Sequence, residues 1–424
     1  MDGTAHTKAG WLATWRKWPL YGRILGALVV GIVLGLVLGK SAHVFELPAK
    51  IILQLLGALA PPLILIAVTH VLMTTEIAGK TALRLGALLI LNTVVAICIG
   101  LFVANTVQPG RWSPQKPPEK HEKAETKGVS PVQIVIDNIP KSLVGPLGDK
   151  PNVIGVIFIA CAFGIALRGQ RTRPIGNVQD IVEVAYQALI TVLHWVIDLV
   201  PIGVLSIVAK VVGTEGFAPF QAMGAFIVAV LMALVLQAGW YLLRIRFFSW
   251  CRPLDVLRGM RDSLVMAFST GSSTATMPVT YACLKDKVGV REESASLGSL
   301  VGANFNNDGT ALYEAMSALF VAQLLGIHLS LSDQLLVVLT SIVASVGAAG
   351  IPEAGLVTMT LVFTAVKLPT DYIALLLTVD WFLDRCRTTI NVLGDVNVSC
   401  LLDGRMKQTV PIESVTSLAS SPAP

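Results

Sequence analysis

The chain has 424 residues, of which 54% are hydrophobic and 14% are charged, and its mean hydropathy is +0.70. Soluble domains usually contain about 25% charged residues, so this composition excludes an ordinary cytosolic protein. The formal net charge of +5 does not indicate nucleic-acid binding, because the basic residues of membrane proteins gather in cytoplasmic loops. Backbone polar groups in lipid must bond to one another, which leaves helices and closed barrels. Barrel strands would be about ten residues long, and the apolar segments here are longer, so an all-α polytopic membrane protein is predicted.

A series of apolar segments occupies the chain up to residue 243. They cover residues 24–39, 49–73, 82–107, 152–167, 178–211 and 222–243. In the first, Gly31, Gly35 and Gly39 stand at every fourth position, which predicts that a neighbouring helix approaches closely. In the second, Pro61-Pro62 predicts a kink, because proline removes a helical hydrogen bond.

Basic residues before the first segment and after the second, fourth and sixth predict that these ends lie in the cytoplasm. The group after the sixth segment begins at Arg244. The Pro-rich loop 109–128 carries basic residues on the opposite side. Its interleaved glutamates weaken this exception without removing it.

After residue 255 the apolar segments become shorter and are broken by glycine, serine and proline. Residues 269–280 and 345–358 are both breaks made of small residues, and each is followed by a stretch with Asn, Asp and Gly, at 306–310 and 391–395. Interrupted hydrophobic segments in two corresponding halves indicate a transporter with a binding site at the membrane midplane. The alternative is a pair of ordinary loops, although loops rarely carry so little charge.

Residues 371–402 contain polar side chains spaced by three or four positions, which a helix places on one face. They are Asp380, Asp384, Arg387, Asn391 and Asp395. A charge at the centre of a membrane helix costs about 2.5–3.5 kcal/mol even on a lenient scale, so these groups should face a cavity, pair or bind ligands. An arginine fork suits a carboxylate, and a nearby Asp suits an ammonium group. Asn and Asp oxygens together suit a hard cation.

Four stretches resemble, in order, the dicarboxylate/amino acid:cation symporter family, which includes bacterial glutamate/aspartate transporters and animal excitatory amino acid transporters. They are SSTATMP (272–278), NNDGTALYEA (306–315), GAAGIPEAG (347–355) and DWFLDRCRTTINVLGD (380–395). The resemblance extends from about residue 20 to 402. It implies eight transmembrane helices, two re-entrant helical hairpins at about 254–290 and 333–368, inverted repeats, and a homotrimeric elevator-type transporter.

The family fold also implies a division of the chain. The parts are a cytoplasmic N-terminal segment (1–19), scaffold helices one and two (20–76), transport-domain helix three (77–108), an extracellular loop (109–151), scaffold helices four and five (152–216), the main transport domain (217–402) and a cytoplasmic tail (403–424).

The resemblance carries site roles to matching positions. Arg387 would bind the side-chain carboxylate of the substrate, and Asp384 would bind its amine. The other substrate contacts would be Thr388, Asn391, Thr310, Ser273, Gly350, Ile351 and Gly355. The first sodium site would comprise Asp395, Asn391, Asn306 and Gly302; the second Asp308, Asn306, Thr93 and Asn92; the third the carbonyls near Asn304, Ser345, Val346 and Ala348.

Further positions bear on the coupled ions. Glu314 and Arg385 match the animal branch, which implies proton co-transport and potassium counter-transport, with the Glu314 carboxylate expected near Arg385. The chain departs from the family at Asn307, where methionine is usual, and at Leu89, where tyrosine is usual. Asn304 and Asn92 replace more usual threonines. Asn307 could add an oxygen ligand or alter the ion coupling.

The predicted function is sodium-driven uptake of aspartate or glutamate across a bilayer, expected to be a bacterial inner membrane. In this family, carriers of neutral amino acids lack an arginine at the position of Arg387, and C4-dicarboxylate carriers lack an aspartate at the position of Asp384. A neutral amino acid and a C4-dicarboxylate are therefore weaker alternative substrates. An intramembrane enzyme would need Asp380 and Asp384 to share a proton, which the neighbouring arginines oppose, so no enzyme is predicted. An anion channel is a third alternative.

Overall fold

The computed structural model describes residues 20–74, 79–112, 173–347 and 354–406, with a few residues between 143 and 167, and these ranges contain helices and no strand. The first helices are α2 (Leu20–Leu38), α3 (Glu46–Thr74), α4 (Gly79–Val107), α7 (Val178–Glu215) and α8 (Ala218–Phe248). Then follow α9 (Pro253–Gly259), α10 (Arg261–Thr270), α11 (Ser273–Ala282), α12 (Glu292–Ser296), α13 (Gly302–Phe305), α14 (Asp308–Leu324), α15 (Leu331–Gly347), α16 (Ala354–Ala365) and α17 (Ile373–Asp403). The short 3-10 helices are η1 (Gly39–Phe45), η2 (Pro109–Trp112) and η6 (Thr370–Tyr372), and the short π-helices are η4 (Cys283–Val288) and η5 (Leu297–Val301).

Four stretches within the described ranges are long and apolar enough to cross a membrane. They are Gly22–Leu56, Leu83–Trp112, Val178–Thr214 and Pro219–Phe248. The predicted segment 152–167 and the loop 109–151 lie largely outside the described residues. The helix α3 continues through Pro61-Pro62, so the predicted kink does not interrupt it.

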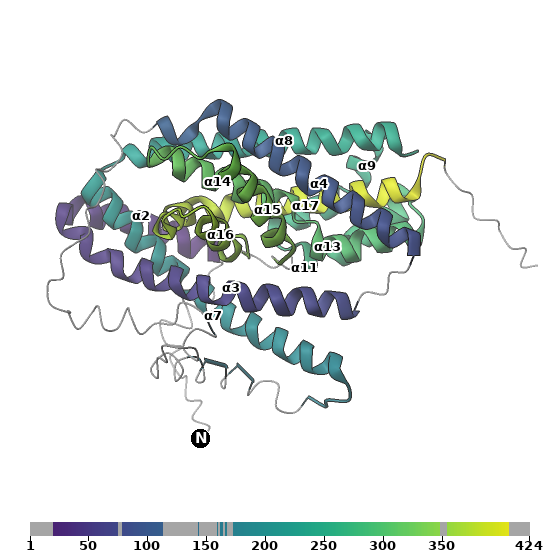
Figure 1. The fold of residues 1–424 in the computed structure, drawn as a ribbon, viewed down its shortest axis with the longest axis horizontal. Helices are drawn as coiled ribbons and strands as arrows, with labels where there is room; N and C mark the ends of the chain where they lie inside the picture. The colour runs from purple at the N-terminus through teal and green to yellow at the C-terminus, as the bar shows by residue number, and fades with distance from the viewer. Residues whose placement is uncertain are drawn as a thin grey trace, which may run out of the picture.

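The helices α2 and α3 pack against the long helix α7 and form one side of the molecule (Figure 1). The glycines of α2 explain how closely α7 approaches. A Cβ atom on Gly31 would lie 2.8 Å from the carbonyl oxygen of Leu205, and one on Gly35 would lie 2.7 Å from that of Ala209. The predicted close approach is confirmed at these two positions. Gly39 makes no such close contact, because nothing lies within 4 Å of its Cβ position. Its φ is +52°, and η1 begins at this residue.

A methyl group at Gly35 should destabilise the protein, because the atom it meets belongs to the backbone of α7 and cannot rotate away. Overpacking of this kind typically costs about 1–3 kcal/mol. We expect Gly35→Ala to unfold at a lower temperature than the wild type. Gly26→Ala is the matched control, since its Cβ would meet nothing within 4 Å. Equal melting temperatures for the two variants would contradict this packing.

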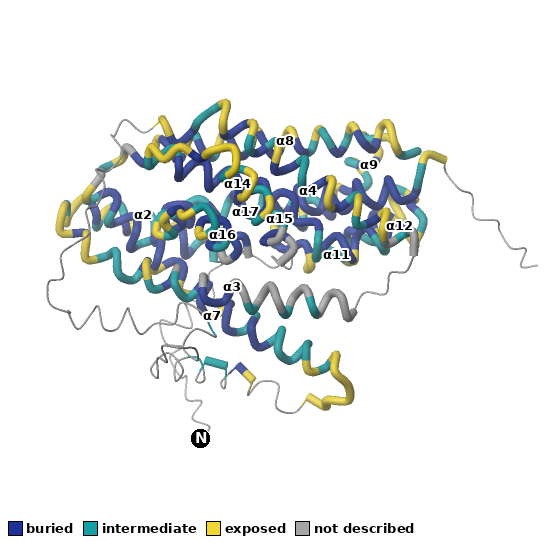
Figure 2. The backbone as a smooth tube through the Cα atoms, in the orientation of Figure 1, coloured by how far each residue is buried: buried dark blue, intermediate teal, exposed yellow. Residues whose placement is uncertain are grey.

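The second body of helices is built around α17. The helices α8, α10 and α14 pack against α17, and α4 packs against α14 and α8. In α14 every residue from Asp308 to Ala322 is buried, whereas Figure 2 shows exposed residues along α8. Polar side chains of α14 and α17 therefore lie inside protein, where they need partners.

Two helical hairpins pack onto this body. The helices α10 and α11 contact one another and α17, and only Gly271 and Ser272 separate them. Gly271 has a φ of +64°, and the Ser272 hydroxyl caps α11 by accepting a hydrogen bond from the backbone N–H of Ala275 at 3.1 Å. The break is thus narrower than the predicted 269–280, because α10 continues to Thr270 and α11 already begins at Ser273. The helices α15 and α16 also contact one another, and residues 348–353 between them lie outside the described residues.

The end of α17 is fastened to three other elements. The buried Asp403 carboxylate accepts hydrogen bonds from Nε1 of Trp250 at 2.7 Å and from Nε of Arg291 at 2.6 Å. Nη2 of Arg84 in α4 donates to the carbonyl of Leu401 at 2.7 Å. The end of α8, the start of α12 and the start of α4 are therefore all held by the last turn of α17.

Candidate functional site

The helix α17 places the predicted polar face inside the protein. Asp380 is 1% exposed, Asp384 7%, Arg387 0%, Asn391 3% and Asp395 2%. The spacing of three and four residues and the low exposure of all five side chains agree with the sequence analysis. Five such groups can be buried together only if they pair with one another or with ligands.

The Arg387 cluster consists of Arg387, Asp380, Asp384 and Tyr313. Nη1 of Arg387 donates to Asp380 Oδ1 at 2.8 Å, and Nη2 donates to Asp384 Oδ1 at 2.8 Å. The guanidinium carbon lies 4.0 Å from the centre of the Tyr313 ring, within cation–π range. Two acids surround one arginine, so with all groups ionised the cluster carries one net negative charge. The predicted carboxylate binder and the predicted amine partner are paired with one another.

Other predicted substrate contacts lie around this cluster. A Cβ atom on Gly355 would lie 3.4 Å from Nη2 of Arg387 and 3.2 Å from Cγ2 of Thr310, so the start of α16 lies against both. On the other side, a Cβ atom on Gly271 would lie 3.0 Å from Oδ2 of Asp384. Both hairpins therefore reach the Arg387 cluster with backbone, as the broken segments predicted.

The remaining predicted substrate contacts differ in their positions and hydrogen-bond partners. Ser273 is 3% exposed and begins α11 beside Gly271. The Thr388 hydroxyl donates to the carbonyl of Asp384 in its own helix at 2.9 Å. Asn391 joins α17 to α14, because its Oδ1 accepts from the backbone N–H of Gly309 at 2.8 Å. The predicted contacts Gly350 and Ile351 lie outside the described residues.

The Asp395 cluster consists of Asp395, Asn306, Asn391 and Gly302. Nδ2 of Asn306 donates to Asp395 Oδ1 at 3.1 Å and to the Asn391 carbonyl at 3.2 Å. A Cβ atom on Gly302 would lie 2.7 Å from Asp395 Cγ, so α13 touches the carboxyl group. Within the described residues, Oδ1 of Asn306 has no hydrogen-bond partner and no basic side chain pairs with Asp395. A buried carboxylate with no counter-charge fits a sodium ion. The Asn306 amide directs its nitrogen to Asp395, and rotation of the amide would offer its unpartnered oxygen to the ion instead.

The Asp308 cluster consists of Asp308, Thr93, Tyr241, Asn92 and Arg244. Thr93 donates to Asp308 Oδ1 at 2.7 Å, and the Tyr241 hydroxyl donates to Oδ2. Nη1 of Arg244 donates to Asn92 Oδ1. The structure thus brings Thr93 to Asp308 as predicted, but it gives the Asn92 oxygen to an arginine and turns the predicted Asn306 amide nitrogen towards Asp395.

Tyr241 and Arg244 were missed as site residues. Arg244 was predicted to belong to a cytoplasmic group after residue 243, whereas α8 continues to Phe248 and Arg244 is only 5% exposed. The only sequence signal is that the two residues are three positions apart, on one helical face.

The third predicted cation site holds an amide nitrogen. Nδ2 of Asn307 donates to the Ser345 carbonyl at 3.0 Å and to the Asn304 carbonyl at 3.3 Å. Nδ2 of Asn391 donates to Asn307 Oδ1 at 3.3 Å, which fixes the orientation of the Asn307 amide. The expected extra oxygen therefore faces away from these carbonyls. Two further predicted members lie where the side chains or residues are not described: Val346 and Ala348.

Glu314 is fully buried beside the Arg387 cluster. The hydroxyl of Thr358 in α16 donates to its Oε1. Arg385 is half-buried, and its Nη1 donates to the Trp381 carbonyl at 2.7 Å. The expected closeness of Glu314 to Arg385 stays a prediction.

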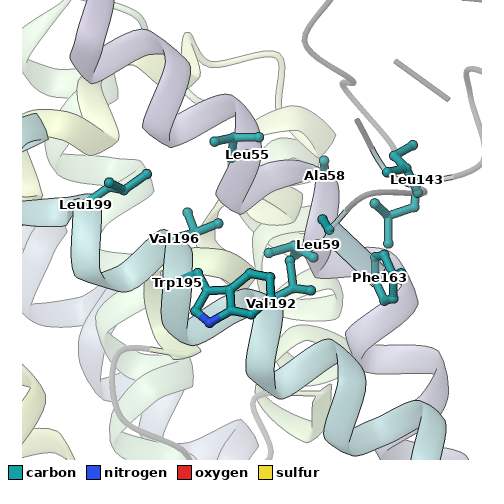
Figure 3. Close-up of a pocket in the computed structure, with 11 residues that line it drawn as sticks. Leu55, Ala58, Leu59, Leu143, Phe163, Val192, Trp195, Val196 and Leu199 are labelled. Atoms are coloured by element: carbon teal, nitrogen blue, oxygen red, sulfur yellow. The ribbon is translucent and has the colours of Figure 1, made fainter. Parts of the chain in front are cut away.

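A cavity of about 270 Å³ lies elsewhere, between α3 and α7 (Figure 3). Its described lining is aliphatic or aromatic and includes Leu55, Leu59, Trp195 and Leu199. Such a lining has nothing to neutralise the charges of an amino acid. The Arg387 cluster is therefore the better candidate substrate site.

Comparisons with known proteins show the family to which the chain belongs. The Sodium:dicarboxylate symporter family matches residues 20–405. Excitatory amino acid transporter 3 of Mus musculus is 30% identical over 471 aligned positions, which cover 95% of this chain and 89% of the relative. Excitatory amino acid transporter 1 of Ambystoma tigrinum is 30% identical over 438 positions, covering 87% and 80%. The protein is thus a multi-pass membrane transporter and not an enzyme, and it belongs to the Sodium:dicarboxylate symporter family.

Proposed function

We propose that the protein is a sodium-driven symporter for acidic amino acids, aspartate or glutamate, that works by an elevator mechanism. The observation that carries the proposal is the pairing of buried Arg387 with both Asp380 and Asp384. One arginine and two acids can exchange partners with a substrate that has one ammonium and two carboxylate groups. A C4-dicarboxylate would give Asp384 no ammonium, and a neutral amino acid would give Arg387 no side-chain carboxylate.

The substrate binds by replacing contacts within the Arg387 cluster. Its side-chain carboxylate takes the guanidinium fork of Arg387, a bidentate geometry suited to arginine. Asp384, released from Arg387, accepts the ammonium group. Hydroxyl and amide groups of Ser273, Thr310, Thr388 and Asn391, with backbone of the two hairpin tips, bind the α-carboxylate. The acidic amino acid adds one net negative charge to the cluster, which the co-transported cations would offset.

Sodium enters the proposal at the Asp395 cluster, where Asp395, Asn306, Asn391 and Gly302 would hold the ion. The ion supplies the positive charge that the buried carboxylate lacks. Asn391 belongs to this cluster and also bonds Gly309 in α14. This one residue therefore connects the cation site, through its backbone carbonyl, with Gly309 and Thr310 of α14, through its side chain.

The proposed moving and static parts follow the packing of the two bodies. Helices α2, α3 and α7 would belong to the scaffold (20–76 and 152–216), and α4 and α8–α17 to the transport domain (77–108 and 217–402). Support comes from α2 and α3 packing on α7, while α8, α10 and α14 pack on α17. Eight transmembrane helices, two re-entrant hairpins, a homotrimer and a bacterial inner membrane complete the proposal.

The proposal is tested by reconstituting the full chain in proteoliposomes. With an inward sodium gradient we expect labelled aspartate or glutamate to accumulate above its outside concentration, and a sodium ionophore should release it. Serine and succinate serve as competitors from the two alternative classes. Accumulation of serine or succinate in place of the acidic amino acids would overturn the substrate assignment, and passive equilibration alone would indicate a channel.

Proton and potassium coupling is proposed for Glu314, with Arg385 as a supporting charge. Gln keeps the shape of Glu314 and its bond to Thr358 but removes the charge. We expect internal potassium to stimulate uptake by the wild type and not by Glu314→Gln. Glu293→Gln, an exposed position, is the matched control. Equal potassium stimulation of Glu314→Gln and the wild type would exclude this role, as would a wild type that ignores potassium.

A further inference from the structure

Arg244 is a buried cation that the substrate site does not use. It lies one turn after Tyr241 on the same face of α8, and it is 5% exposed. Its Nη1 donates to Asn92 Oδ1, and its guanidinium carbon lies 5.9 Å from the centre of the Trp240 ring. The guanidinium therefore enters the Asp308 cluster through Asn92, which is one of the predicted sodium ligands, and not by a direct ion pair with Asp308.

The hydrogen bonds of the Asp308 cluster leave little for a sodium ion to bind. Sodium needs oxygen lone pairs directed at one point, and it competes poorly with donors that already hold them. Both oxygens of Asp308 accept from hydroxyl groups, of Thr93 and Tyr241. The Asn92 oxygen accepts from Arg244. A sodium ion here would also be repelled by the guanidinium, strongly so at the low effective dielectric of a buried site.

The Asp395 cluster provides the internal comparison. It also has a buried carboxylate and a buried asparagine. Arg244 donates to Asn92 in the Asp308 cluster, whereas no basic side chain donates to a member of the Asp395 cluster among the described residues, and the Asn306 oxygen has no partner there. One cluster therefore carries a counter-charge from the protein, and the other does not. The second fits sodium and the first does not.

We propose that the guanidinium group of Arg244 is a built-in counter-ion of the Asp308 cluster and takes the position that the family resemblance assigns to a sodium ion. Sodium coupling then uses the Asp395 cluster and not the Asp308 cluster. This inference deepens the proposed sodium-driven symport. The measurement of substrate binding rests on that proposed function, whereas the measurement of melting temperature needs neither substrate nor transport.

The test removes the built-in charge and asks whether sodium replaces it. Purified full-length protein carrying Arg244→Met is melted in NaCl and in choline chloride at equal ionic strength, without amino acid. A ligand that binds the folded state alone stabilises it by RT ln(1 + [L]/Kd). We expect sodium to raise the melting temperature of Arg244→Met more than that of the wild type. Arg244→Lys, which keeps the charge, and Arg246→Met, an exposed neighbour on α8, should both respond like the wild type.

The second measurement counts sodium ions by linkage. The slope of log apparent affinity for aspartate or glutamate against log sodium concentration gives the number of ions bound together with the substrate. Arg244→Met should gain one unit, which is an extra tenfold gain in affinity for each tenfold rise in sodium. Asp308→Asn in the wild-type background should keep the wild-type slope. Asp308→Asn in the Arg244→Met background should lower the slope by one unit, back to the wild-type value.

Each outcome decides the proposal. A folded Arg244→Met protein with wild-type sodium response in both measurements overturns it, and so does loss of one unit of slope in Asp308→Asn alone. If Arg244→Met does not fold in either salt, the slope of Asp308→Asn decides. If no acidic amino acid binds to the wild type, the substrate proposal fails, and the melting comparison still tests Arg244.

Discussion

Replacing Arg387 by cysteine should abolish uptake of aspartate and glutamate. The side-chain carboxylate would then enter a buried cluster that holds Asp380 and Asp384 and no cation. Truncating one partner of a buried hydrogen-bonded charge pair costs about 2–5 kcal/mol, so the apparent affinity should fall by roughly thirtyfold to several thousandfold. Labelled-substrate uptake and equilibrium binding by purified protein measure the loss. Neutral amino acids such as serine should lose less, because Asp384 still receives their ammonium group.

The loss must be separated from misfolding, because Arg387→Cys leaves two buried acids without their arginine. Adding Asp380→Asn removes the excess negative charge and should recover thermal stability without recovering acidic substrate uptake. Arg246→Cys is the matched control on the exposed side of α8. Normal aspartate or glutamate uptake by Arg387→Cys would refute the substrate assignment.

Asp395→Asn should produce the second large effect, loss of sodium-driven accumulation. The substitution keeps the shape of the side chain and removes the only formal charge of the Asp395 cluster. The melting temperature of the wild type should rise with sodium concentration, and that of Asp395→Asn should rise much less. Asp371→Asn, at an exposed position just before α17, controls for the charge change. A variant that still accumulates substrate with the wild-type sodium dependence would contradict a cation site at Asp395.

The sequence was informative where burial and periodicity coincide. In α17, charged residues repeat every three or four positions between apolar ones, so both the helix and its buried polar face could be predicted. The glycines of α2 predicted the contact with α7 for the same reason, because only a close approach needs Gly31 and Gly35 together. Glycine is also common in membrane helices, and an exposed amphipathic helix gives a similar polar stripe, so the structure was needed to decide both cases.

The sequence was less informative where side chains choose between partners in space. An arginine just after an apolar segment usually lies at the membrane surface, so nothing local shows that α8 carries Arg244 into the Asp308 cluster. The two ends of the Asn307 amide are chemically opposite, yet the sequence does not show which end meets the carbonyls of Asn304 and Ser345. That choice depends on Asn391, more than 80 positions away.

The last turn of α17 has a consequence for how the protein is made. Arg84 bonds to the carbonyl of Leu401, 317 positions later. Trp250 and Arg291 bond to the carboxylate of Asp403, which is also synthesised after them. Chains emerge from the ribosome N-terminus first, and long-range contacts form slowly. We therefore expect α4, α8 and the first hairpin to remain loosely assembled during synthesis. The body of helices around α17 should then pack in one late step, after α17 has been synthesised.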